Sequence, residues 1–199
     1  MQNMYSSIVA KRLVDVMIVK EIINPKDKNI YLYGIQEGII LIENLIVTAV
    51  LGIFFGHIIE TLIFLIAYIP LRSFSGGYHA LNQKRCFVYS ILLILFIQIY
   101  LAWFNTTFFI ITFILYFIFL IYLCRYAPLP SQNKPLSSFE KKKYGKKVRL
   151  ICGIESVLFL LSITAQYVKI ANGIMLAIVI TGLLFWIEKR HIITNKRLI

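Results

Sequence analysis

The chain has 199 residues, of which 59% are hydrophobic and 15% charged, and its formal net charge is +12 at pH 7. A soluble domain of this length cannot bury so much apolar surface, because its small core leaves most of the chain exposed. The composition therefore predicts an integral membrane protein. The positive charge does not indicate nucleic acid binding, because the lysines and arginines lie between long apolar runs and not in one basic patch.

The first segment, about residues 4–24, combines apolar residues at helical spacing with charged residues between them. It is too charged to span a bilayer, so we expect an amphipathic helix that lies flat in the membrane interface. A soluble helix packed on the other cytoplasmic loops fits the same pattern. Asn24 and Pro25, followed by the charged run 26–28, are expected to end it.

Six apolar segments follow, and a helix needs about 20 apolar residues to cross the hydrocarbon core. Five segments satisfy this within a few residues. The second is short and contains Glu60 and Pro70, so it is expected either to span as a short helix or to be re-entrant. The fold class is therefore all-α, with segments at 33–55, 57–71, 87–104, 107–124, 148–168 and 170–187.

The distribution of charge predicts the topology. If all six segments span and both ends lie inside, every lysine and arginine except Lys169 falls on the inner side or at its edge. The inner segments are then 1–32, 72–86, 125–147 and the tail 188–199. The outer loops are almost absent, so function is expected in the membrane or at its cytoplasmic face. We expect a single polytopic domain over residues 1–199, with the membrane region at 33–187 and the N-terminal helix within 1–28.

The inner loop 72–86 contains the one close Cys/His pair of the chain, His79 and Cys86. A cysteine becomes a nucleophile as its thiolate, which neighbouring cations and a helix N-terminus stabilise. Lys84 and Arg85 precede Cys86, and the third apolar segment begins there. His79 could act as base and then protonate a leaving amine. The alternative is a histidine at the membrane edge and a buried, inert cysteine.

The spacing of the pair constrains its geometry. On one straight helix the two α-carbons would share a face but lie about 10.5 Å apart, so a hydrogen-bonded pair requires a bend or helix break. Gly76 and Gly77, just upstream, permit the backbone of such a turn. Glu60, Asn82 and Gln83 are weak candidates to orient His79, and a dyad without a carboxylate fits equally well.

The other chemistry-bearing residues predict less. Cys124 and Cys152 lie at the cytoplasmic ends of apolar segments and are expected to be packing residues, or at most lipid-modified. The scattered cysteines and histidines match no zinc spacing, so no metal or cofactor is expected. The lysine-rich loop 125–147 is interpreted as a topology determinant resting on anionic lipid, as a docking surface for an acidic peptide, or as both.

Taken together, Arg72-x4-Gly77-Tyr78-His79-x6-Cys86 and the later Tyr126-Ala127-Pro128…Lys134-Pro135 loop resemble the AgrB family of accessory gene regulator proteins. The resemblance extends over most of the chain. The GGYHA-x6-C element is specific, whereas the Ala-Pro and Lys-Pro loop is only supportive.

The resemblance implies a cysteine endopeptidase in the cell membrane of a Gram-positive bacterium that processes an AgrD-like quorum-sensing propeptide. The family enzyme removes an acidic C-terminal tail through an acyl-enzyme thioester and lets a propeptide side chain close a macrocycle. Carried over by position, Cys86 is the nucleophile and His79 its base. Arg72 and Gly77 support the site, and Lys134 contributes from the next inner loop.

Two other functions fit the apolar segments, a small peptide exporter with a structural Cys/His loop and a non-enzymatic scaffold. Broken central helices or internal repeats would favour a transporter, and neither is clear in the sequence. Two GxxxG patterns, Gly34/Gly38 and Gly52/Gly56, allow helices to approach closely and are compatible with the homodimer that we expect.

Overall fold

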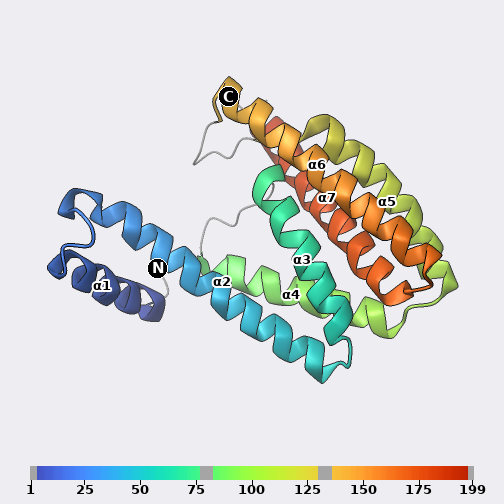
Figure 1. Ribbon diagram of the computed structural model, residues 1–199, viewed down its shortest axis with the longest axis horizontal. Helices are drawn as coiled ribbons and strands as arrows, with labels where there is room; N and C mark the ends of the chain where they lie inside the picture. Colours follow the sequence, from blue (N-terminus) through green and yellow to red (C-terminus); the bar gives the residue numbers. More distant parts are fainter. Residues whose placement is uncertain (1–3, 77–82, 130–135, 197–199) are drawn as a thin grey trace. The chain divides into compact units, whose positions relative to one another are not determined.

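The computed structural model describes residues 4–76, 83–129 and 136–196 (Figure 1). Over these ranges the chain is helical and contains no strand, which confirms the predicted all-α class for the part of the chain described. The elements are α1 (Met4–Val19), the 3-10 helix η1 (Pro25–Asp27), α2 (Lys28–Phe54), α3 (Ile58–Ser75), α4 (Gln83–Ala102), α5 (Thr106–Tyr126), α6 (Ser138–Thr164) and α7 (Val168–Lys196).

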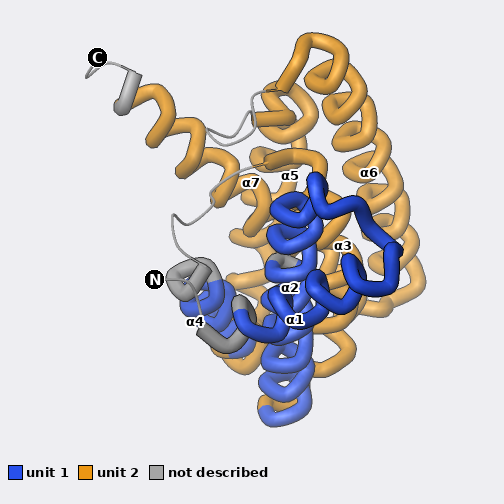
Figure 2. Tube along the Cα trace, turned by 90° about the vertical axis from the view of Figure 1, so that its left-hand side faces the viewer, with its two compact units in different colours: residues 1–54, 79–98 blue, residues 55–78, 99–199 orange. Residues whose placement is uncertain are grey.

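The chain divides into two compact units, which Figure 2 shows in different colours. Unit 1 comprises residues 1–54 and 79–98, and unit 2 comprises residues 55–78 and 99–199. Most of α4 therefore belongs to unit 1 and its last turn to unit 2. That the whole of 1–199 acts as one membrane domain stays a prediction.

Within unit 1, helix α1 packs along α2. Ala10 and Val14 of α1 are fully buried, which shows that one side of this helix faces protein. Lys28 at the start of α2 reaches back to α1, where its Nζ lies 2.7 Å from Asp15 Oδ1. The placement of α1 in a membrane interface stays a prediction.

Helix α1 ends at Val19, earlier than the predicted end near residue 24. Glu21 adopts a φ of 55°, in the left-handed region, and this conformation takes the chain out of the helix. Asn24 then caps η1, since its side-chain oxygen accepts a hydrogen bond from the backbone N–H of Lys26. Asn24 and Pro25, which were predicted to end the first helix, thus start η1.

Four of the described helices are long and apolar enough to cross a bilayer: α2 together with η1, α3, α5 and α7. They correspond to the first, second, fourth and sixth predicted segments. The described apolar part of α4, Phe87–Ala102, is shorter, and α6 begins with several charged turns before its apolar part. Six full spans therefore stay a prediction.

Helix α3 is longer than its predicted segment, because it continues through Pro70 to Ser75. Its 18 residues give it enough length to cross a membrane. That it spans fully stays a prediction. The first four residues of the predicted loop 72–86 are helical.

Parts of the predicted inner loop 125–147 and of the predicted tail 188–199 are helical as well. The lysine run of the predicted loop 125–147 lies in the first turns of α6, which a capping box starts: Ser137 Oγ accepts from the N–H of Glu140, and Glu140 Oε2 accepts from the N–H of Ser137. The predicted tail 188–199 continues α7 as far as Lys196.

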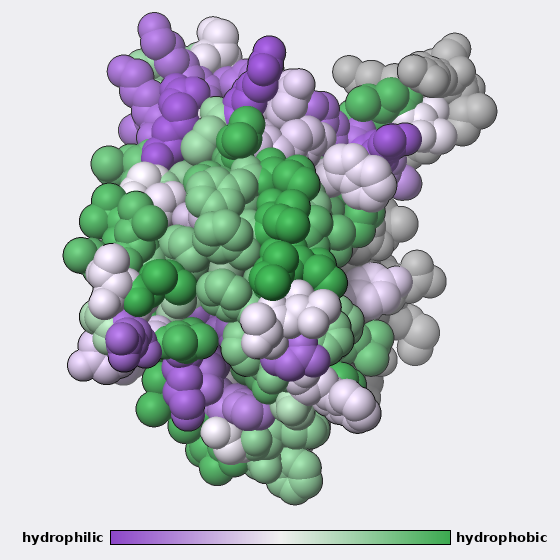
Figure 3. All heavy atoms as spheres, turned by 90° about the vertical axis from the view of Figure 1, so that its right-hand side faces the viewer, coloured by the Kyte–Doolittle hydropathy of each residue, from purple (hydrophilic) through white to green (hydrophobic). Residues whose placement is uncertain are grey.

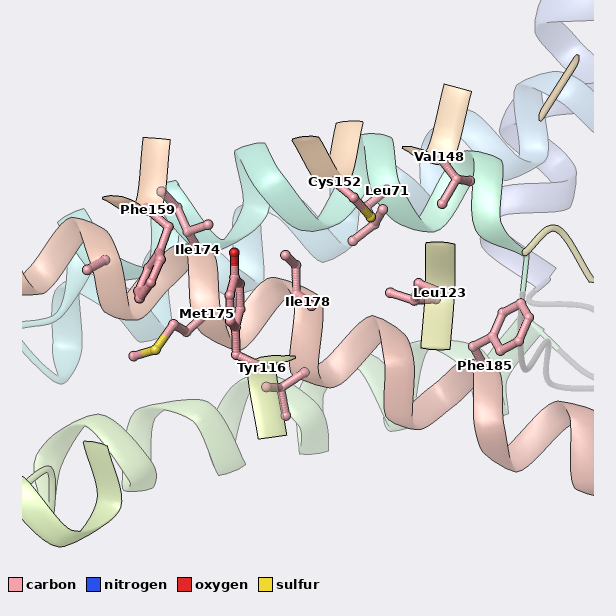
Figure 4. Close-up of a cluster of buried hydrophobic side chains, with 12 residues drawn as sticks. Leu71, Tyr116, Leu123, Val148, Cys152, Phe159, Ile174, Met175, Ile178 and Phe185 are labelled. Carbon is pink, nitrogen blue, oxygen red and sulfur yellow. The ribbon is translucent and has the colours of Figure 1, made fainter. Parts of the chain in front are cut away.

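Helix α7 is the central helix of unit 2, and α3, α5 and α6 pack around it (Figure 1). Every residue from Ala171 to Gly182 is buried. Figure 4 shows Ile174, Met175 and Ile178 of α7 among side chains from the three neighbouring helices. Tyr116 of α5 closes this core with a hydrogen bond of 3.0 Å from its hydroxyl to Ser156 Oγ of α6.

Large apolar side chains remain exposed on the outer faces of α5 and α6, among them Ile114, Ile121, Val157 and Leu160. Figure 3 shows one face on which hydrophobic side chains form a broad band, with hydrophilic side chains gathered above it. Soluble monomers rarely expose a contiguous apolar patch of more than a few hundred Å². The band is the surface expected to face lipid.

Gly173 of α7 provides a test of this packing. A Cβ at this position would lie 3.0 Å from the carbonyl oxygen of Glu60 and 2.8 Å from Ile63 Cγ2, both on α3. Gly173→Leu is expected to destabilise unit 2 by about 1–3 kcal/mol or more, because overpacking forces the two helices apart. Thermal unfolding in detergent measures the effect. Gly153→Leu on α6, where nothing lies within 4 Å of the new Cβ, is the matched control, and equal losses in both variants would contradict this account.

Candidate active site at the end of helix α3

The last turn of α3 forms the described edge of the predicted active-site loop. The backbone turns out of the helix at Gly76, which has a φ of 75°. The Gly76 carbonyl accepts hydrogen bonds from the Arg72 guanidinium and, at 3.1 Å, from Ser75 Oγ. The final carbonyls of a helix have no partner within it, so these side chains replace the missing backbone donors. Two predicted site-supporting residues, Arg72 and Gly76, are thus in direct contact.

A short extended segment, residues 127–129, forms a hydrogen bond with the last turn of α3. The N–H of Leu129 donates to the carbonyl of Ser75 over 2.9 Å. The peptide bond between Ala127 and Pro128 is cis. The carbonyl oxygen of Ala127 lies against Gly145 of α6. The end of α3 is therefore tied through residues 127–129 to the end of α5 and to α6.

Gly76 is the residue that permits this contact. A Cβ built there would lie 2.7 Å from the backbone oxygen of Leu129, closer than real Cβ contacts allow. The positive φ adds strain for any other residue. The sequence predicted a special backbone at Gly76 and Gly77, and at Gly76 this prediction is confirmed.

Cations stacked on aromatic rings surround the same region of unit 2. Lys147 Nζ of α6 lies 4.3 Å from the ring centroid of Phe74, the residue just before Ser75. Lys189 Nζ of α7 lies 3.4 Å from the ring centroid of Tyr126, the last residue of α5. A cation over an aromatic face is held in place while it keeps its charge. The arrangement provides positive charge at the end of α3, from Lys147, and at the end of α5, from Lys189.

The remaining predicted site residues are less fully described. Gly77, His79 and Lys134 lie outside the described residues. Cys86 falls in the first turn of α4, but its side chain also lies outside the description. The pairing of His79 with Cys86, and the helix break that it requires, stay predictions.

Glu60 is far from the candidate site. It lies in the first turn of α3, about 24 Å along the helix axis from Gly76 at 1.5 Å per residue. Its Oε1 lies 3.6 Å from Lys169 Nζ and 3.9 Å from His57 Nδ1. The buried carboxylate is thus paired at the other end of the helix, which argues against it as the group that orients His79.

Cys124 and Cys152 are packing residues, as the sequence predicts. Cys152 is buried in the core of unit 2, where Figure 4 shows it beside Leu71, and Cys124 is partly buried against the same core. The segment 127–129 is what sequence reasoning missed. Its signal was the Ala127-Pro128 pair, but no local pattern shows that this segment contacts the end of α3.

A protein-family model matches most of the chain. The family model described as accessory gene regulator B, AgrB, matches residues 10–186. The chain belongs to the AgrB family. The resemblance seen in the GGYHA-x6-C element is thereby confirmed.

Curated relatives carry the same family name. The chain is 30% identical over 162 residues to an AgrB-like protein of Clostridium perfringens strain 13, covering 76% of each chain. It is also 30% identical over 170 residues to an AgrB-like protein of Clostridium acetobutylicum, covering 82% of this chain and 79% of that protein. No solved structure matches the chain significantly. The chain is thus a membrane protein of agr quorum-sensing processing, and its family implies an AgrD-like propeptide substrate.

Substitution of Gly76 tests the tie between α3 and residues 127–129. Gly76→Ala is expected to push Leu129 away and break its hydrogen bond to Ser75, because the new methyl group and the Leu129 oxygen cannot share the space. Hydrogen exchange at the Leu129 amide should accelerate about tenfold or more, in proportion to the roughly 1–1.5 kcal/mol net value of one such bond. Gly34→Ala, at a site with open space, is the control. Unchanged exchange at Leu129 in Gly76→Ala would refute the role of Gly76.

Proposed function

We propose that this AgrB protein is a membrane-embedded cysteine endopeptidase that removes the C-terminal tail of an AgrD-like propeptide and promotes its macrocyclisation. Cys86 is the nucleophile and His79 the base. The observation that carries the proposal is the first turn of α4, which holds Cys86 in a chain whose family processes such a propeptide. Unpaired N–H groups at a helix start favour the thiolate form of a cysteine.

The first step forms an acyl-enzyme. His79 takes the proton of the Cys86 thiol, and the thiolate attacks the carbonyl carbon of the scissile peptide bond. The carbon–nitrogen bond then breaks, the tail leaves with the proton returned by His79, and the rest of the propeptide stays attached to Cys86 as a thioester.

The second step releases a ring. A cysteine thiol or serine hydroxyl of the propeptide attacks the thioester carbon while its proton passes to His79. The bond to Cys86 breaks, and the enzyme thiol is restored by that proton. Transfer from a thioester to a thiol is nearly energy-neutral, so ring closure needs no further energy source, provided that water is kept away from the acyl group.

The described residues would act by positioning. Arg72 holds the Gly76 carbonyl, so it would fix the backbone that leads through Gly77 to His79. Lys134 and the stacked lysines Lys147 and Lys189 would present positive charge to an acidic tail, because complementary charge steers a partner to its site. In this scheme the protein acts in the cell membrane of a Gram-positive bacterium, next to anionic lipids and as a homodimer.

Tail release tests the catalytic assignment. With the chain in liposomes and a synthetic AgrD-like propeptide added, mass spectrometry should detect the free tail and a propeptide adduct on Cys86. Cys86→Ala and His79→Ala are expected to lower the rate of tail release by about 10³-fold or more, as loss of a nucleophile or its base does elsewhere. Cys124→Ala, which changes a cysteine outside the site, should retain activity. Tail release that survives Cys86→Ala would remove Cys86 from the mechanism.

Labelling from outside intact cells tests the cytoplasmic placement of the site. An impermeant maleimide should fail to modify Cys86 in a variant that keeps this cysteine alone. A cysteine introduced in place of Lys169, expected outside by the charge distribution, should react readily in a cysteine-free background. Modification of Cys86 from outside would overturn the topology.

A further inference from the structure

Helices α3 and α6 of unit 2, together with the start of α7, enclose a groove of about 610 Å³. This volume lies within the ~300–1,000 Å³ range of ligand sites. Its lining is almost entirely aliphatic, and it includes Ile63 and Pro70 of α3 and Ile151 and Leu158 of α6. Ile66, Ile154 and Leu161 of the lining are each more than half exposed, so the groove is open to the surroundings of unit 2.

One carboxyl group lines the groove. Glu155 of α6 is only 5% exposed, and its Oε2 has no hydrogen-bond partner among the described residues. The other polar residue that α6 contributes to the lining, Ser162, already has a partner, since its hydroxyl donates to the carbonyl of Leu158. A carboxyl group at this depth is costly unless something pairs with it. A molecule that fills the groove and offers one donor would remove this cost.

The shape of the groove indicates the kind of molecule. On α6 its lining residues recur at helical spacing from Ile151 to Ser162, and on α3 from Ile63 to Pro70. The α6 stripe is about 17 Å long at 1.5 Å per residue, which is about three helical turns. Two parallel helical stripes with a furrow between them accept the side chains of a third helix. A helix also satisfies its own backbone, which an extended peptide in hydrocarbon does not.

The position of the groove connects it with the candidate site. Pro70 lines the groove near the last turns of α3, and Arg72 and Gly76 follow within the next two turns of the same helix or just after it. A chain segment lying in the groove would therefore run toward the end of α3 that carries Arg72 and Gly76. A lipid acyl chain could fill the apolar part, but it carries no donor for Glu155.

We infer that this groove binds an apolar helical segment of the peptide substrate, with one hydrogen-bond donor of that segment placed opposite Glu155. The inference rests on the proposed function, because it assigns the binding of that same substrate. It gives the enzyme a binding site inside the membrane that is separate from its scissile-bond site.

Photocrosslinking tests occupancy without requiring catalysis. p-Benzoylphenylalanine is introduced in place of Leu158, which lines the groove, or in place of Leu160, which is exposed on another face of the same helix. The full chain in liposomes is irradiated with a synthetic AgrD-like propeptide. Position 158 should capture the propeptide at least severalfold more than position 160. Capture of lipid alone, capture of a second copy of the chain, or equal capture at both positions would overturn the inference.

Kinetics test whether occupancy matters. Leu158→Trp fills the groove, and Leu160→Trp is its matched control. We expect Leu158→Trp to raise KM about tenfold for the full propeptide, which corresponds to about 1.4 kcal/mol of lost binding. For a short soluble peptide around the scissile bond, KM should not change. Equal effects on both substrates would indicate a general disturbance and contradict specific binding in the groove.

Variants of Glu155 test the predicted donor. Glu155→Leu removes the acceptor and the buried polar group together, so folding should be preserved and is checked by thermal unfolding. Its KM for the full propeptide should rise about tenfold, whereas Glu155→Gln, which keeps an acceptor oxygen, should show a smaller rise. An unchanged KM in Glu155→Leu would remove Glu155 from the binding site.

The experiments distinguish failure of the peptidase assignment from failure of the groove assignment. If the wild-type chain cuts neither substrate but position 158 captures the propeptide, the peptidase assignment is wrong and the groove still binds the peptide. If the wild-type chain releases the tail but position 158 captures no more propeptide than position 160, the groove assignment is wrong and the peptidase stands.

Discussion

Unit 2 depends on the burial of a single helix, α7. Between apolar helices in lipid there is no hydrophobic driving force, so they associate through close packing and hydrogen bonds. Helix α7 achieves this with an unbroken buried run from Ala171 to Gly182 and with the close approach of α3 at Gly173. Across the core, the rings of Tyr116 and Phe159 join α5 to α6 with centroids 4.8 Å apart. Because α3 is held along α7 and α6, its last turn has a defined position.

The candidate site uses that fixed position. A helix end is normally a weak point, because its last carbonyls lack partners. Here the carbonyl of Ser75 accepts from Leu129, and that of Gly76 accepts from Arg72. The donors come from a separate segment of chain and from the preceding helical turn. A catalytic group is most effective when its supporting residues are themselves locked. A rigid α3 end directly before the loop of His79 is therefore the arrangement that the proposed chemistry requires.

Hydropathy and the GGYHA-x6-C motif predicted the helical class and the family, because both are local patterns. Helix boundaries were harder to predict. The lysine run of 141–147 was interpreted as a loop from its charge, although Ser137 and Glu140 form the capping-box pattern that starts a helix. The contact of Leu129 with Ser75 joins residues far apart in the chain, and no periodicity reveals such a contact. The spacing of residues likewise did not predict the partner of Glu60. That partner is Lys169, and the pair forms because the first turn of α3 lies near the start of α7.

Two buried carboxyl groups of unit 2, Glu60 and Glu155, differ in whether the fold provides a partner for them. Glu60 is paired with Lys169, the one cation that the charge distribution places outside, so the fold itself offsets the cost of burying it. The Oε2 atom of Glu155 is equally buried but has no such partner in the part of the chain that the structure describes. A buried polar group normally has a hydrogen-bond or charged partner, and a group that lacks one within the fold tends to mark a functional site. The contrast suggests that the cost at Glu155 is offset by a bound partner, and the apolar groove beside it determines what that partner can be.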